Sequence, residues 1–180
     1  MFGIDGQIRQ ASSMTYNSKS IAGMFVYSPA TANGNTYYAY SRAEFYNGNG
    51  YTTFTGYKYP VLKHPFIKNM NTTDTPTAIK NLMAKTEYEV NDNGETYGSA
   101  LSAYTIGAEP DLISAVGTNG VEGYVRADDL TPKVSSIEEA LEQNAENGDV
   151  RTIPLYAEDG ETVLGEFELV TNIEYDIDTN

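Results

Sequence analysis

The stretch YEVNDNGETYGSALSAYTIGAEPDLISAVGTNGVEGYVRADDL, residues 88–130, decides the fold class of this chain. Short runs of alternating apolar and polar residues are separated by Asn-Gly pairs, which is the pattern of β-strands joined by tight turns. The expected elements are strands at 88–90 and 96–103 around a turn at 91–94, and strands at 112–116 and 121–125 around a turn at 117–120. The stretch therefore predicts antiparallel hairpins.

Two further elements are expected on the C-terminal side. Ser135-Ser136 before Glu138-Glu139 is a capping signature, and Gly148 ends the helix that it begins. A last hairpin is expected from strands at 152–156 and 162–169 around a turn at 158–160. The acidic tail after Asn172 is predicted to be loose.

The N-terminal half contains a tyrosine-rich series of strands. Asn33-Gly34 and Asn47-Gly48-Asn49-Gly50 are hairpin signals, because Asn and Gly accept the positive φ of tight turns. They join predicted strands at 21–28, 36–45 and 51–58 into an antiparallel meander. Residues 7–16 are interpreted as an edge strand or a frayed end, and 75–85 as a short helix with one apolar face.

Composition and charge agree with this outline. The chain has 15 Tyr, 6 Phe and no Trp, and β-rich proteins favour such residues. Residues 1–85 hold eight Lys/Arg and three Asp/Glu, whereas residues 86–180 hold three and 22. We expect a mainly β, α+β protein. Its first part, 1–85, is a Tyr-rich antiparallel meander plus a linker helix; its second part, 86–180, is an acidic hairpin module with one helix. Whether the parts are two domains or one is left open.

The residue types exclude several chemistries. There is no cysteine, so disulfides, thiolate metal sites and cysteine nucleophiles are excluded. His64 is the single histidine, and no G-x-S-x-G motif is present, so we predict no catalytic residues. The acidic second half argues against nucleic-acid binding. A carboxylate-based glycan hydrolase stays open as an alternative, because it needs only Asp and Glu, and Glu44 lies within the Tyr-rich strand.

No cofactor is expected, and calcium is the best metal candidate. Calcium takes oxygen ligands from flexible loops. Asn91, Asp92, Asn93 and Glu95 supply such oxygens around Gly94, although the bidentate Glu of an EF-hand loop is missing. Asn-Gly turns have the same appearance without a metal.

The tyrosines of the meander are the main candidates for ligand binding. They are Tyr37, Tyr38, Tyr40, Tyr46, Tyr51 and Tyr57. Alternation along a strand places Tyr38 and Tyr40 on one face and Tyr37 on the other. An exposed row of tyrosines suits a sugar or protein partner, because the side chain offers apolar area with a polar tip. Packing within the core is the competing interpretation.

A series of motifs in the second half resembles a known module. The motifs are Thr96-Tyr97-Gly98-Ser99, Glu109-Pro110-Asp111-Leu112-Ile113, residues 115–126, Ile153-Pro154-Leu155-Tyr156 and residues 159–167. Together they resemble an uncharacterised extracellular module of Firmicutes, which covers roughly residues 87–170. It occurs in secreted or surface proteins, including the outer regions of some BlaR1-type sensor peptidases. The HExxH motif of those peptidases is absent, so the resemblance implies location and no peptidase activity.

These observations lead to one expected function and two alternatives. We expect a non-catalytic, secreted or cell-surface module of a Gram-positive bacterium that binds a protein or a glycan. The alternatives are the glycan hydrolase and a structural spacer of a surface protein. No run approaches the roughly 18 apolar residues of a membrane span, and the start MFGIDGQIRQ lacks signal-peptide features. We therefore expect that a signal or anchor has been removed.

Overall fold

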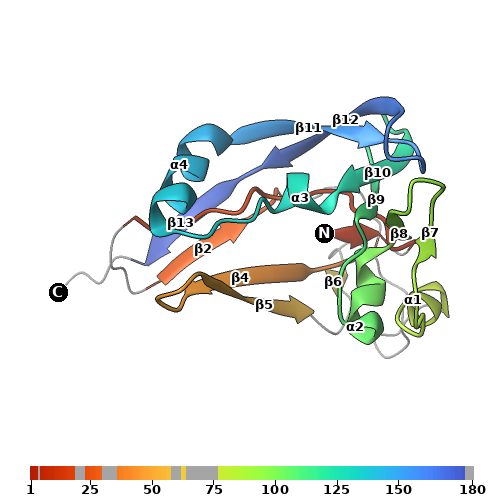
Figure 1. Cartoon of the computed structure of the whole chain (residues 1–180), viewed down its shortest axis with the longest axis horizontal. Coiled ribbons are helices and arrows are strands. Elements are labelled where there is room, and N and C mark those ends of the chain that lie inside the picture. Colours follow the sequence, from red (N-terminus) through yellow and green to blue (C-terminus); the bar gives the residue numbers. More distant parts are fainter. Residues whose placement is uncertain (4, 19–22, 30–35, 58–61, 64–76, 177–180) are drawn as a thin grey trace.

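The computed structural model describes residues 1–3, 5–18, 23–29, 36–57, 62–63 and 77–176 (Figure 1). Antiparallel strands dominate, which confirms the predicted mainly β, α+β class. The strands are β1 (Phe2–Gly3), β2 (Gly23–Tyr27), β3 (Thr36–Tyr38), β4 (Tyr40–Tyr46), β5 (Tyr51–Tyr57), β6 (Leu62–Lys63), β7 (Glu89–Val90), β8 (Thr96–Gly98), β9 (Leu112–Val116), β10 (Glu122–Arg126), β11 (Val150–Tyr156), β12 (Val163–Val170) and β13 (Asn172–Asp176). The helices are α1 (Thr77–Leu82), the 3-10 helix η1 (Ala100–Ser102), α2 (Ala103–Ile106), α3 (Ala127–Leu130) and α4 (Ile137–Asn147).

Six strands form the main sheet, in the order β12-β11-β10-β9-β8-β7. The predicted hairpins β9–β10 and β11–β12 are confirmed, and β8 and β9 pair in parallel. The prediction of a strand over residues 96–103 is confirmed for Thr96–Gly98 and wrong for the residues after Gly98. Ser99 begins η1 there, because its side-chain oxygen accepts a hydrogen bond from the Leu101 amide and caps the helix.

The N-terminal segment 8–11 bridges β9, an interior strand of this sheet, and β12, the strand at one end. The Ile8 amide donates to the Ser114 carbonyl at 2.8 Å, and the Val116 amide donates to the Ile8 carbonyl at 2.9 Å. Three residues later, the Ala11 carbonyl accepts from Val170 of β12 at 3.0 Å. Because β10 and β11 lie between β9 and β12, the sheet must curl back on itself. The segment interpreted as an edge strand or a frayed end thus closes the main sheet.

The inward face of the closed sheet forms the core. Alternation along β9 to β12 turns one set of apolar side chains inward, each at most 3% exposed: Ile113, Ala115, Val125, Ile153, Leu155, Phe167 and Leu169. Residues from the first part of the chain, including Phe2, Ile8 and Ile79, belong to the same cluster. Both parts therefore share one core.

Helix α4 confirms the predicted capping signature. The Ser136 side chain accepts from the Glu139 amide at 3.2 Å, and the Glu139 carboxylate accepts from the Ser135 amide at 2.7 Å. The side chains of Asn144 and Asn147 then donate to main-chain carbonyls of residues 14–16. Helix α4 is thereby fastened to the segment that follows the closure.

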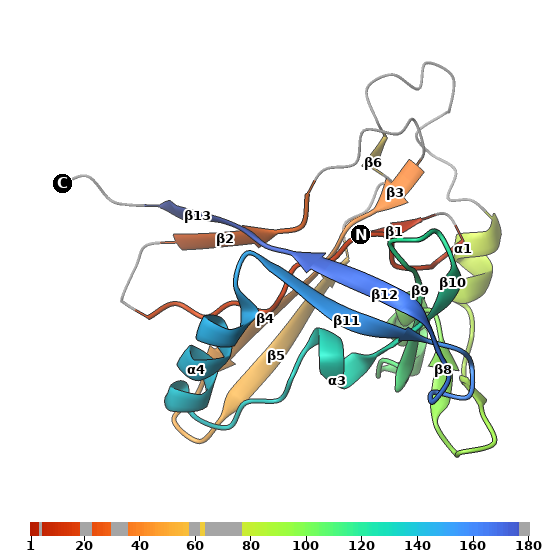
Figure 2. The same ribbon diagram turned by 90° about the horizontal axis from the view of Figure 1, so that it is seen from above.

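The predicted meander is observed in part. The β4–β5 hairpin around residues 47–50 is confirmed. The strand predicted at 36–45 is divided at Ala39 into β3, which pairs with β1 and β6, and β4, which pairs with β5 alone among the described strands. Strand β2 pairs with β13, not with β3 (Figure 2). A local pattern does not encode such a distant partner, and the Asn33-Gly34 turn lies outside the described residues.

The tail predicted to be loose therefore begins as a strand. Asn172 pairs with Tyr27 and Glu174 with Phe25. Its alternation of acidic with apolar residues suits an edge strand, which charge protects from further pairing. The division proposed at residue 85 stays a prediction; the β2–β13 ribbon and segment 8–11 connect its two parts through main-chain hydrogen bonds.

Replacing Gly123 tests the close packing of β10 on β11. A Cβ at this position would lie 2.6 Å from the Tyr156 carbonyl oxygen. Gly123→Ala should therefore lower the free energy of unfolding by about 1–3 kcal/mol in urea denaturation followed by circular dichroism. The control is Gly120→Asn, at an open turn position with φ of 78° that asparagine tolerates. Equal midpoints for the two variants would contradict this packing.

Candidate functional site

The β4–β5 hairpin carries four of the six candidate tyrosines. Its turn is closed by a hydrogen bond from the Asn47 amide to the Gly50 carbonyl at 2.9 Å, and Gly48 and Gly50 have φ of 94° and 118°. Strand pairing places Tyr46 beside Tyr51 and Tyr40 beside Tyr57. Because side chains alternate along a strand, the hairpin has two chemically different faces.

The inner face carries a polar network around Glu44. The side chain of Glu44 is 8% exposed, and its carboxylate accepts from the Tyr16 hydroxyl at 2.7 Å, from Arg42 at 3.1 Å and from Thr53 at 3.2 Å. Burial and the hydrogen bond to Glu44 raise the pKa of Tyr16, so its hydroxyl stays protonated. The hairpin is thus bonded to the N-terminal segment.

A second carboxylate extends this network. Arg42 also contacts Glu109 at 3.6 Å, and the Tyr40 hydroxyl donates to Glu109. Glu44 and Glu109 therefore share one guanidinium, and two neighbouring carboxylates are what a glycan hydrolase requires. Glu109, which precedes β9, is held by Tyr40 and Arg42 of the hairpin, and these contacts connect the hairpin to the main sheet.

The outer face of the hairpin is apolar and exposed. Phe45 and Phe54 are 61% and 57% exposed, and their ring centroids lie 5.5 Å apart at an interplanar angle of 77°. Ala43 and Thr52, their cross-strand neighbours, are uncharged and exposed. We call Ala43, Phe45, Thr52 and Phe54 the phenylalanine face.

The structure distributes the predicted tyrosines over different environments. Tyr37 is 7% exposed and lies in β3, so it contributes to the interior. Tyr40 is half-buried with its ring against Phe2 at 5.8 Å. Tyr46 is 44% exposed, and its ring lies 5.4 Å from that of Tyr51, which is half-buried. The side chains of Tyr38 and Tyr57 lie outside the described residues, as does His64.

The phenylalanine face was not predicted from the sequence. The prediction was based on the many tyrosines, and those of the β4–β5 hairpin lie on the same face as Arg42 and Glu44. Phe45 stands at an odd position of the same strand, and alternation from a buried Glu44 places it on the opposite side. The alternation that separates Phe45 from Glu44 is present in the sequence, but it indicates an exposed Phe45 only once the covered face of the hairpin is known.

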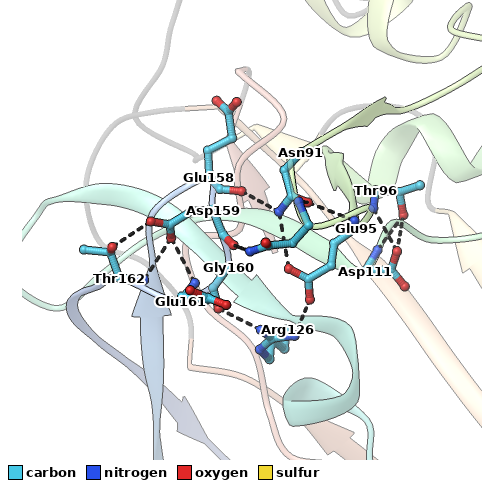
Figure 3. Close-up of polar contacts among 11 residues, drawn as sticks. Asn91, Glu95, Thr96, Asp111, Arg126, Glu158, Asp159, Gly160, Glu161 and Thr162 are labelled. Atoms are coloured by element: carbon cyan, nitrogen blue, oxygen red, sulfur yellow. Dashed lines mark hydrogen bonds and ion pairs between the residues drawn. The ribbon is translucent and has the colours of Figure 1, made fainter.

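Two of the calcium candidates, Asn91 and Glu95, lie in a contact between two loops (Figure 3). The Asn91 side-chain oxygen accepts from the amides of Asn93 and Glu95, and its amide donates to the Glu158 carbonyl at 2.9 Å. Asn93 donates to the Asp159 carbonyl at 2.9 Å, and Asp92 is exposed. Within the part of the chain that the structure describes, no group of three or more His, Asp or Glu side chains is placed to hold a metal.

Arg126 links these two loops. It contacts Glu95 at 2.5 Å and donates to the Gly160 carbonyl at 2.7 Å, and its guanidinium lies 5.2 Å from the centre of the Tyr156 ring. The hydrogen bond to Glu95 raises the pKa of Arg126, which stays charged. The carboxylate proposed as a calcium ligand is thus paired with an arginine in this structure.

No protein-family model, curated protein or solved structure matches the chain. Among the residues described, no helix combines the length and the apolar character that a membrane span requires.

The contact between the loops is testable by a double-mutant cycle on Arg126→Met and Glu95→Gln. Because the pair is partly exposed, we expect a coupling of about 1 kcal/mol in the free energy of unfolding. Additive effects would show that the two side chains do not interact.

The calcium interpretation is tested by thermal unfolding of the wild type with added calcium chloride. A higher unfolding midpoint would mean that the ion competes with Arg126 for Glu95 and would support the calcium interpretation.

Proposed function

We propose that this chain is a non-catalytic, secreted or cell-surface module of a Gram-positive bacterium, and that it binds a protein or a glycan through the β4–β5 hairpin. The exposed phenylalanine face is the observation that carries the proposal. Two large aromatic side chains on a regular hairpin, each more than half exposed, have no role in the core. Exposed apolar surface of this kind is typical of interaction sites.

The ring geometry favours a protein over an extended glycan. Sugar rings stack on flat aromatic platforms, whereas the rings of Phe45 and Phe54 stand nearly perpendicular, edge to face, and form no such platform. Apolar side chains of a partner protein can pack against either exposed ring. The formal net charge of −14 also disfavours a second copy of this chain as the partner, because like-charged molecules repel each other.

The proposed location rests on the resemblance of residues 87–170 to an extracellular module of Firmicutes. The absence of cysteine is compatible with it, since a core shared by both parts of the chain needs no disulfide.

The hairpin proposal is tested with the double variant Phe45→Thr, Phe54→Thr. Both side chains are exposed and threonine suits a strand, so the thermal midpoint should change little. Binding to surface-protein fractions and to a glycan array should fall at least about tenfold, since two exposed aromatic anchors are lost. The matched control is Val163→Thr, which removes an apolar side chain that is 60% exposed on β12.

Three other outcomes would contradict the proposal. Unchanged binding of the double variant would place the ligand elsewhere. Failure of the wild type to bind any probe would favour the structural spacer. Release of reducing sugars from a wall glycan, abolished by Glu44→Gln or Glu109→Gln, would support the hydrolase.

A further inference from the structure

The outward face of the main sheet carries a corner of two tyrosine rings. Tyr97 on β8 and Tyr124 on β10 flank β9, and their register partners on it are Leu112 and Ser114. Their ring centroids lie 5.6 Å apart at an interplanar angle of 85°. Both residues are half-buried.

Two exposed carboxylates flank this corner. The Tyr97 hydroxyl donates to Glu89 at 3.0 Å, and Glu158 is a second hydrogen-bonding neighbour of the same hydroxyl. Both carboxylates also act electrostatically on Tyr124. We call Tyr97, Tyr124, Glu89 and Glu158 the tyrosine corner.

Cations of the chain itself already lie at the edges of this surface. Lys85 contacts Glu89 at 3.2 Å, and Arg126 lies against the ring of Tyr156, the register partner of Tyr124. An aromatic face attracts a cation through its quadrupole, and a neighbouring carboxylate adds to that attraction. The surface thus already holds one ammonium–carboxylate contact, at Glu89, and one guanidinium–aromatic contact, at Tyr156.

We propose that the tyrosine corner binds the ammonium group of a lysine side chain from a basic segment of a partner protein. Two aromatic rings in contact distinguish this corner from an ordinary acidic surface, because the face of an aromatic ring attracts a cation. The charge of the surrounding chain is complementary: residues 86–180 hold 22 acidic and three basic side chains. Long-range attraction would therefore steer a basic segment toward this half of the molecule.

The protonation states suit this ligand. The hydrogen bond from Tyr97 and the contact with Lys85 lower the pKa of Glu89, so its carboxylate stays charged. The hydrogen bond to Glu89, burial and Glu158 raise the pKa of Tyr97, so its hydroxyl stays neutral. Glu89 is therefore negatively charged at neutral pH, where a lysine side chain is positively charged.

The test uses the whole chain and a synthetic peptide of four Lys-Gly repeats, with affinity measured by calorimetry. The control peptide carries acetylated lysines, which keep their length and lose their charge. We expect the charged peptide to bind and the acetylated peptide to bind at least about tenfold more weakly. Tyr124→Leu should weaken binding about fivefold, whereas Tyr124→Phe, which keeps the ring face, should change it less than about twofold.

Two exposed glutamates provide a matched pair of charge variants. Glu158→Gln removes one charge at the corner, and Glu142→Gln removes one charge on the exposed side of α4. We expect the first to weaken binding several-fold and the second to leave it nearly unchanged. Lys85→Ala should strengthen binding, because it frees Glu89 from a competing ammonium.

Several results would overturn the proposal. Equal binding of both peptides, equal effects of Tyr124→Leu and Tyr124→Phe, or equal effects of the two glutamate variants would reduce the site to a general acidic surface. Tighter binding of spermidine than of the peptide would reject a protein segment as the ligand. The double variant Phe45→Thr, Phe54→Thr should bind the peptide normally, so failure at the hairpin and failure at the corner are distinguishable.

Discussion

The closure of the main sheet by residues 8–11 is the constraint on which the rest of the structure depends. Without it, the part of β9 beyond its pairing with β8 and the free side of β12 would present unpaired amides and carbonyls, and the inward apolar face would be open to water. The two hydrogen bonds of Ile8 to β9 and the bond from Val170 of β12 to Ala11 pair part of each strand. A bond from the Thr118 amide to the Glu166 carbonyl at 2.9 Å holds the curled sheet from the turn side.

This closure also explains why the two parts of the chain, so different in charge, share one core. The segment that closes the sheet brings Phe2 and the ring of Tyr40 into contact, and Tyr40 in turn reaches Glu109. Tyr16 follows the closure and holds Glu44 of the hairpin. The hairpin is thus attached through its polar inner face, and its apolar outer face remains exposed as a consequence.

The two proposed surfaces differ in chemistry and lie on different sheets. The phenylalanine face is uncharged and sits on a two-stranded ribbon, while the tyrosine corner is acidic and sits on the main sheet. Both surfaces contain aromatic side chains, but the residues beside the rings differ. Ala and Thr beside the rings favour apolar groups of a partner, and Glu beside the rings favours cations. One chain can therefore offer separate surfaces to different partner segments.

Local patterns in the sequence determined the fold class, the hairpins β4–β5, β9–β10 and β11–β12, and helix α4. Each depends on residues close in the chain, such as Asn47 to Gly50 in one turn and Ser136 with Glu139 in one cap. Tertiary structure alone decided that β2 pairs with β13, that residues 8–11 close the sheet, and that Tyr37 is buried while Phe45 is exposed. It also brought Tyr97 and Tyr124 together across β9. The physical reason is the same in each case: alternation shows that a strand has two faces, but which face is covered depends on segments distant in sequence.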